Sequence, residues 1–148
     1  MSKSLDVPFE TTLLVRDTCL CLHAQRTARS LARRFDEALR PVQLTNGQFS
    51  LLMSLNRPEP PAMGPVAALL AMDQTTLTAA LKPLERRGLV EVTLNPADRR
   101  KRLLRLTAGG QALLRQAVPI WEQTHHATEA LLPDMNAEAV RRAMRALA

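Results

Sequence analysis

The segment from Lys82 to Arg105 constrains this chain more than any other part of its sequence. It holds eight basic and three acidic residues, so it supplies +5 of the net charge of +6. The letters LKPLERRG predict the end of a helix, and LVEVTL and LLRLT predict two short strands that flank the turn NPADRRKR. A helix beside a basic β-hairpin suits duplex DNA, because the helix fits the major groove and the hairpin reaches phosphates or the minor groove.

Length and composition place the chain among ordinary globular proteins. Its 148 residues favour one domain, and 46 % apolar and 23 % charged residues are typical of a folded chain. The longest apolar run, residues 60–72, is short and broken by prolines, so we expect no membrane span. A net charge of +6 favours nucleic acid, an acidic partner or an anionic membrane surface, and charge alone does not choose among them.

Helical signals dominate the rest of the chain. No glycine, internal proline or turn cluster interrupts residues 8–40, which predicts one long helix that ends before Pro41. Further helices are expected over residues 46–55 after a Thr45 cap, 64–71, 74–87 after an Asp73 cap, 108–132 after a Thr107 cap with a bend near Pro119, and 137–147 after an Asn136 cap. The fold class is therefore mainly α with one small β-hairpin.

The helix that follows Asp73 divides its residues between two faces. At about 100° per residue, Leu77, Leu81 and Leu84 fall together and should pack on the two preceding helices. Pro83 should bend the helix. The opposite side offers Gln74, Thr75, Thr76 and Thr78 to base edges, and Lys82 and Arg86 to phosphates. For this helix taken alone, a solvated basic face is the alternative interpretation.

The neighbouring elements favour DNA over that alternative. A short helix, the tight turn at residues 71–73 and a helix with small polar residues in its first turn have the order of a helix-turn-helix. The basic hairpin adds a wing. We expect residues 45–106 to form a winged helix-turn-helix lobe within a single domain over residues 1–148.

The run MDQTTLTAALKPLERRGLVEVTLNPADRRKRLLRLTAGGQALL resembles the signature of the MarR family of winged-helix transcriptional regulators. The pieces ERRGLV, DRR and LTAGG are its most specific parts, and the resemblance extends to LTNGQFSLLMSL and to the first helix. The loop RPEPPAMGP departs from the family pattern and predicts an altered or shortened first strand. The resemblance implies a transcriptional regulator, not an enzyme, that binds a palindromic operator.

For the wing, the resemblance implies an Asp-x-Arg pattern, which Asp98 and Arg100 meet. The arginine of this pattern enters the minor groove and the aspartate helps to fix it. A narrow, electronegative minor groove attracts an arginine, so the physical interpretation agrees. Arg99 and Lys101 lie beside it and are further candidates for DNA contacts. The alternative for Asp98 is an ordinary turn residue after Asn95-Pro96.

The resemblance also implies a homodimer built from residues 8–40 and 107–148. The terminal helices hold more apolar residues than one winged lobe needs, although a domain of this size can bury several of them itself. The dimer would place two recognition helices about one DNA turn apart.

Regulators of this type usually respond to a small, often aromatic or phenolic anion. The candidates for its site are His23, Arg26, Phe49 and Met53, and the alternative for each is a core or helix-surface role. The function implied is a repressor that a ligand releases from DNA. Ligand and DNA would then be coupled through the geometry of the dimer.

Cys19 and Cys21 leave three interpretations open. The amino terminus has no apolar secretion signal, so we expect a cytoplasmic protein with reduced thiols. Cys21 falls where the peroxide-sensing OhrR branch of the family has its reactive cysteine, but the tyrosines of that site are missing. On one intact helix the two thiols point about 200° apart and cannot bridge. Inert thiols, oxidation sensing and metal binding remain, and no tight metal-ligand spacing exists.

The sequence shows no phosphate loop, nucleophile elbow or acid-base pair, so we expect no enzyme and no cofactor. A winged helix used as a protein-interaction module or antirepressor is the alternative from a different class. The small polar residues of the recognition helix, together with Lys82 and the wing residue Arg100, favour DNA.

Overall fold

The computed structural model describes residues 6–148. Two compact units make up the chain, residues 1–34 and residues 35–148, and each is described by itself. The amino-terminal segment in which we expect no secretion signal begins with residues 1–5, which lie outside the described residues. The assignment of all 148 residues to a single domain, with its lobe at residues 45–106, stays a prediction.

The prediction of a single long helix over residues 8–40 is wrong. Helix α1 (Phe9–Thr18) ends and helix α2 (Leu20–Leu39) begins on either side of Cys19, whose backbone is extended with φ −69° and ψ 109°. The Thr18 hydroxyl donates to the carbonyl of Leu14 at 2.7 Å, and the Cys19 sulfur accepts from the backbone N–H of Leu22 at 3.4 Å. Such side-chain contacts to the backbone compete with helical continuation, and hydrophobic periodicity does not reveal them.

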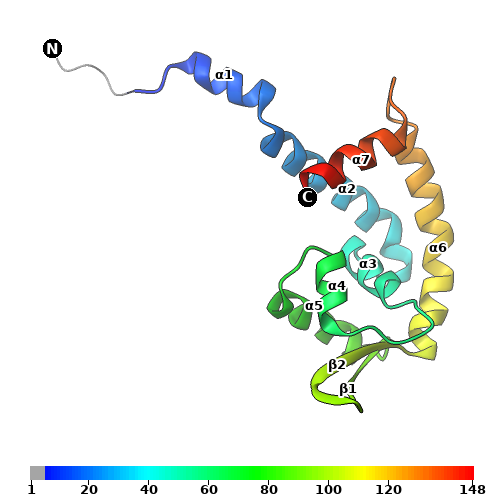
Figure 1. The fold of residues 1–148 in the computed structure, drawn as a ribbon. Coiled ribbons are helices and arrows are strands. Elements are labelled where there is room, and N and C mark those ends of the chain that lie inside the picture. The colour runs from blue at the N-terminus through cyan, green and yellow to red at the C-terminus, as the bar shows by residue number, and fades with distance from the viewer. Residues whose placement is uncertain (1–5) are drawn as a thin grey trace. The chain divides into compact units, whose positions relative to one another are not determined.

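Helix α2 ends before Pro41, where the sequence predicted the end of the long helix. Helix α2 stops at Leu39, and a short 3₁₀ helix η1 (Arg40–Val42) follows with a proline in its first turn. The larger unit continues with α3 (Asn46–Ser54), α4 (Met63–Leu69), α5 (Gln74–Arg86), β1 (Val90–Asn95), β2 (Asp98–Leu106), α6 (Ala108–Glu129) and α7 (Ala137–Leu147). The prediction of a mainly helical fold with one hairpin is confirmed. Figure 1 shows the hairpin at one end of the larger unit, with α6 running away from it.

The four predicted helix caps are confirmed. Thr45 and Gln48 form a reciprocal capping box at the start of α3. Asp73, Thr107 and Asn136 each accept backbone N–H groups at the starts of α5, α6 and α7. These contacts satisfy donors that the first turn of a helix leaves unpaired. Pro83 and Pro119 lie inside α5 and α6, and the bends expected there stay predictions.

Asp36 in the last part of α2 holds the start of α3. Its Oδ1 accepts from the backbone N–H of Asn46 at 2.7 Å and from the side-chain amide of Asn46 at 2.8 Å. The backbone hydrogen bond is the main cause, and the side-chain bond the second, of a pKa for Asp36 that lies below its ordinary value. The charged form of Asp36 is therefore the form that the fold favours.

We expect Asp36→Ala to lower the free energy of unfolding by about 1 kcal/mol at neutral pH, because Asn46 loses its acceptor. A depressed folded-state pKa gives stability that is present above the unfolded pKa of about 3.9 and is lost as pH falls through the folded pKa. The difference from wild type should therefore shrink in acid. Urea unfolding at neutral and acid pH measures it, with Glu37→Ala, an exposed neighbour, as control. Equal effects of the two variants would contradict this role.

The hairpin turn is tighter than predicted. The strands pair antiparallel from Val90 with Leu106 to Asn95 with Asp98, so only residues 96 and 97 lie between them. The Asn95 side chain accepts from the N–H of Ala97 at 2.9 Å, which closes the turn without the eight residues expected. Residues 99–102 consequently belong to strand β2.

The first strand expected before the third helix is reduced to one bridge. Ala62 pairs with Leu103, and the carbonyl of Pro61 accepts from the N–H of Leu104 at 2.9 Å. Prolines lack the N–H that a longer ladder needs. The predicted shortening of this strand is confirmed.

The leucine face of α5 is buried as predicted. Leu77, Leu81 and Leu84 are at most 2 % exposed, and they share one cluster with Leu52 of α3 and Val66 of α4. Each buried leucine contributes about 1.5–3 kcal/mol, so α5 is held to the lobe mainly by this face. None of the helices in the described part of the chain is both long and apolar enough to cross a membrane.

Candidate nucleic-acid interface

The polar face of α5 lies on the surface of the lobe. Gln74, Thr75 and Thr76 are exposed in its first turn. Thr78 is half-buried, and its hydroxyl donates to the carbonyl of Gln74 at 2.8 Å. Lys82 is exposed farther along the helix. Arg86 is exposed at its end. The helix therefore presents small polar groups first and basic groups later, as the sequence predicted.

The turn before α5 sets the position of this face. Ala71 adopts the left-handed conformation, with φ 52°, which turns the chain sharply after α4. Asp73 then accepts from the N–H of Thr76 at 2.7 Å. This backbone bond to Thr76 is the first cause of a pKa for Asp73 below its ordinary value. The charged cap keeps the first turn of α5 ordered where Gln74 and Thr75 meet solvent.

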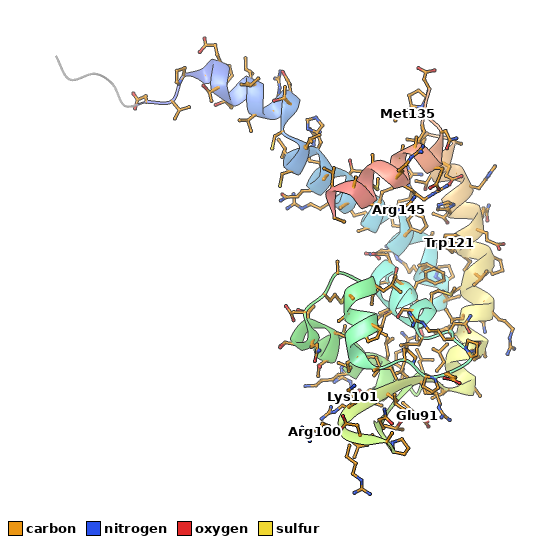
Figure 2. All side chains as sticks on the ribbon, viewed as in Figure 1. Glu91, Arg100, Lys101, Trp121, Met135 and Arg145 are labelled. Carbon is orange, nitrogen blue, oxygen red and sulfur yellow. The ribbon has the colours of Figure 1, made fainter. Side chains whose placement is uncertain are left out.

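A groove joins the predicted recognition helix to the predicted wing. It has a volume of about 690 Å³ and is lined from α5 by Gln74 and Thr78 and from β2 by Arg100 and Lys101. The start of α4 and Arg102 complete its lining. Figure 2 shows Arg100 and Lys101 on the hairpin, at the opposite end of the larger unit from Met135. Four residues that sequence reasoning chose separately thus share one groove, which carries basic side chains.

The wing residues occupy a strand and not a loop at the hairpin tip. Arg99, Arg100 and Lys101 are all exposed within β2. Asp98 contacts the backbone of Arg100, since its Oδ1 accepts the Arg100 N–H at 3.1 Å. Among the described residues no ion pair joins Asp98 to Arg100, so the carboxylate shapes the strand start and leaves the guanidinium available.

Sequence reasoning missed two contributions to this surface. Arg102 lines the groove, and its place two residues after Arg100 in a strand was the available signal. Met63, Gly64 and Pro65 at the start of α4 also line it, and no local pattern marked them. Arg87, which follows Arg86 at the end of α5, has a structural role, because its Nη1 donates to the carbonyl of Gln43 at 2.7 Å.

The four candidates for effector binding belong to both units. His23 and Arg26 line a surface pocket of about 590 Å³ on α2, together with Thr27, Arg29, Ser30 and Arg33. Phe49 is buried in the core of the larger unit, where its ring stacks on Trp121 with centroids 6.1 Å apart. Met53 is 38 % exposed on α3. The structure therefore brings His23 and Arg26 together, and their role stays a prediction.

Both cysteines are free thiols. Cys19 is half-buried at the junction of α1 and α2, and Cys21 is exposed. In residues 6–148 no three or more His, Cys, Asp or Glu side chains are placed so that they could hold a metal ion. The geometric objection to a bond between these thiols assumed an intact helix, and the break at Cys19 removes that assumption.

Comparison with known proteins adds a family and relatives of known structure. The MarR family model matches residues 44–101. The HTH-type transcriptional repressor NicR of Pseudomonas putida is 36 % identical over 81 residues, which cover 55 % of this chain and 51 % of NicR. The chain thus matches about half the length of this curated relative.

Three solved structures are similar over most of their length. The M. tuberculosis transcriptional regulator MosR in complex with DNA is 38 % identical, with 88 % of this chain and 93 % of that chain covered and a TM-score of 0.80. CouR bound to a 23-mer DNA duplex is 29 % identical, with 90 % and 94 % covered and a TM-score of 0.80. CouR from Rhodococcus jostii RHA1 is also known bound to p-coumaroyl-CoA, at 25 % identity, 88 % and 92 % coverage and a TM-score of 0.76.

Proposed function

We propose that this chain, which belongs to the MarR family, is a cytoplasmic, sequence-specific DNA-binding regulator that acts as a repressor. The groove between α5 and β2 is the observation that carries the proposal. It combines Gln74 and Thr78 with Arg100 and Lys101, which are groups suited to base edges and to phosphates. Two similar proteins, MosR and CouR, have been solved with DNA.

Each part of this surface has a separate task in the proposed complex. The first turn of α5 enters the major groove, where amide and hydroxyl groups contact base edges. Lys82 and Arg86, farther along α5, lie where the sugar-phosphate backbone passes. The exposed guanidinium of Arg100 enters the minor groove, whose negative potential attracts it. The segment from Lys82 to Arg105 supplies most of the net positive charge, which draws the protein toward DNA.

The experiment is fluorescence anisotropy on the duplex immediately upstream of the gene for this chain, against a scrambled duplex, over a salt series. Preferential binding that weakens steeply with salt is expected, because released counterions accompany each phosphate contact. Weak and equal binding to both duplexes, repeated on duplexes selected from a random library, would overturn the proposal. That result would favour the protein-interaction alternative.

The proposed regulator is a homodimer held by its terminal helices. Nine of the twelve large apolar side chains that are exposed among the described residues lie in two terminal segments, residues 7–20 and 131–147. α1 and α7 bury none of their own residues. Exposed apolar surface of this extent favours burial against a second copy. A dimer would also supply two DNA-binding lobes, one for each half of a palindromic operator.

Leu147→Glu is expected to weaken this dimer by about tenfold or more, because a carboxylate would replace an apolar contact. Leu147 is 70 % exposed in the single chain. Leu69→Glu is the matched control, since Leu69 is 62 % exposed but lies on α4. Sedimentation velocity over a concentration series measures both. A monomeric wild-type chain, or equal effects of the two substitutions, would count against the interface.

The effector in this proposal is a small aromatic or phenolic anion that releases the protein from DNA. Three arginines and His23 line the pocket on α2, which supports an anionic ligand. CouR, bound to p-coumaroyl-CoA, is an example of a similar protein with an aromatic acyl ligand. An effector can act only by binding the DNA-free form more tightly than the DNA-bound form.

A further inference from the structure

Another pocket of the larger unit shares no lining residue with the groove between α5 and β2. Its volume is about 310 Å³, and three segments that are far apart in the chain form it. Arg57 comes from the loop after α3, Arg105 from the end of β2, and Gln111 from the first turn of α6. Figure 1 shows the loop between α3 and α4 passing across the start of α6.

The loop after α3 is fixed at both of its ends. The N–H of Arg57 donates to the carbonyl of Leu55 at 2.9 Å, which forms a tight turn where α3 ends. Farther along, the carbonyl of Pro61 accepts from the N–H of Leu104 at 2.9 Å and so ties the loop to β2. Two of residues 58–60 are prolines, which restrict the backbone between these bonds. The wall that the loop contributes to the pocket is therefore formed before any ligand binds.

Gln111 connects the same loop to α6. Its Nε2 donates to Oδ1 of Asn56 at 3.1 Å, across 55 positions of the chain. A side-chain amide nitrogen carries two hydrogens, and this bond uses one of them. The other hydrogen remains as a donor in the pocket, next to the two arginines.

The two arginines of the pocket have no counter-charge of their own. Arg57 and Arg105 are exposed, and neither forms an ion pair within residues 6–148. Glu59 lies in the loop and Glu91 lies opposite Arg105 across the hairpin, but neither carboxylate lines the pocket. Two guanidinium groups beside one small pocket repel each other. A negatively charged ligand removes this repulsion, so the pocket favours an anion.

The rest of the lining indicates the kind of anion. Guanidinium groups bind carboxylate and phosphate groups through paired hydrogen bonds, and two of them match two negative charges. The other lining residues are apolar, namely Leu55, Pro58, Pro60 and Leu106. An inorganic ion would leave this apolar surface uncovered, whereas an organic body would cover it. The volume is at the lower end for small-molecule sites, which favours a small ligand.

We propose that this pocket binds a small organic dianion, either a phosphate monoester or a dicarboxylate. The charged groups lie between Arg57 and Arg105, with Gln111 as a further donor, and the apolar part contacts the prolines of the loop. The site shares no residue with the pocket on α2 proposed for the effector. The loop that builds it lies in the segment that departs from the MarR family pattern, so the site is a feature of this chain.

Isothermal titration calorimetry on the full chain tests the proposal without DNA, so its outcome is independent of the proposed function. The probes are phenyl phosphate and phthalate, with inorganic phosphate and benzyl alcohol as controls, in a dilute buffer that contains neither phosphate nor carboxylate. We expect saturable binding of at least one of the two organic dianions, weaker binding of inorganic phosphate, and none of benzyl alcohol. The dianion that binds identifies the charged group. No saturable binding of either dianion, or inorganic phosphate binding as tightly as both, would overturn the proposal.

Arg57→Gln and Arg105→Gln should each weaken binding of the organic dianion by about tenfold or more, because a charged hydrogen-bond donor is lost. Arg99→Gln is the matched control on β2, since Arg99 is exposed and does not line the pocket. Arg29→Gln is the control for the pocket on α2, which Arg29 lines. Both controls should keep the affinity of the wild type. Equal losses in all four variants, or a loss confined to Arg29→Gln, would place binding elsewhere and refute the site.

Thermal unfolding separates ligand binding from a structural role of the two arginines. Without ligand, Arg57→Gln and Arg105→Gln should be at least as stable as the wild type, because each removes a repulsion between like charges. The bound dianion should raise the Tm of the wild type and leave the Tm of both variants almost unchanged. A large loss of stability in both variants without ligand would show that these side chains serve the fold and would contradict the proposal.

Discussion

Gly110→Ala is expected to lower the free energy of unfolding by about 2–3 kcal/mol, because α6 begins in direct contact with the backbone that leads into β1. Gly110 is buried in the first turn of α6, and a Cβ built there would overlap the carbonyl oxygen of Leu89. That Cβ would also lie 3.2 Å from a methyl group of Leu106. The overlap involves backbone, so relief requires movement of the strand or of the helix. Thermal and urea unfolding measure the loss.

Gly47→Ala is the matched control, because Gly47 also lies in the first turn of a helix and a Cβ there meets no atom within 4 Å. Alanine has the higher helix propensity, so this variant should be neutral or more stable by up to about 1 kcal/mol. Opposite signs for the two substitutions would identify the close approach as the cause. A Gly110→Ala protein as stable as wild type would show that the strand yields easily.

The contact at Gly110 also explains how the wing is joined to the rest of the lobe. The Thr107 hydroxyl donates to the carbonyl of Gly88 at 2.5 Å and accepts from the N–H of Gly110 at 3.0 Å. The N–H of Thr107 donates to the carbonyl of Leu89 at 3.1 Å. Gly88 itself has φ 70°, a conformation that glycine adopts without strain. These contacts therefore join the start of β1 to the start of α6.

Arg100→Ala is expected to weaken operator binding by about tenfold or more and to lower the salt slope by about one, because one charged groove contact disappears. The side chain is exposed and lines the groove with Gln74 and Thr78. The hydrogen bond from its backbone to Asp98 is kept in the variant, so the hairpin should keep its shape. Anisotropy on the operator and on a scrambled duplex measures affinity and slope together.

Arg115→Ala is the control for the loss of one positive charge, since Arg115 is exposed on α6 and does not line the groove. It should change the affinity for DNA far less, and sedimentation should show that neither variant alters the oligomeric state. Equal losses for the two variants would mean that net charge, and not the position of the guanidinium, determines binding. An unchanged salt slope for Arg100→Ala would remove it from the contacts.

Much of the DNA-binding lobe was predictable because its signals are local. The caps at Thr45, Asp73, Thr107 and Asn136 each act within their own helix, so a residue type and its spacing suffice to find them. The leucine face of α5 follows in the same way from one helical period. The concentration of basic residues in the hairpin is a property of composition and needs no coordinates.

The remaining features depend on contacts that periodicity does not record. At the break, the Cys19 thiol and the Thr18 hydroxyl contact the backbone, in a stretch whose residue types all permit a helix. The predicted hairpin turn was too long because residues 99–102, which are basic, were assigned to a loop. Pairing with β1 keeps them in strand β2. Residue type alone does not distinguish an exposed strand from a loop.

The sequence by itself determined most of the order of helices and strands and the buried face of α5, because neighbours along the chain decide both, but it did not reveal the break at Cys19. It also supplied the residues proposed to meet DNA. Only the tertiary structure decided which of those residues share a groove, that Arg87 binds the Gln43 carbonyl, and that Gly110 must have no side chain. Each of these depends on segments far apart in the chain approaching closely. Such approaches are set by packing of the core, which acts on the whole lobe at once.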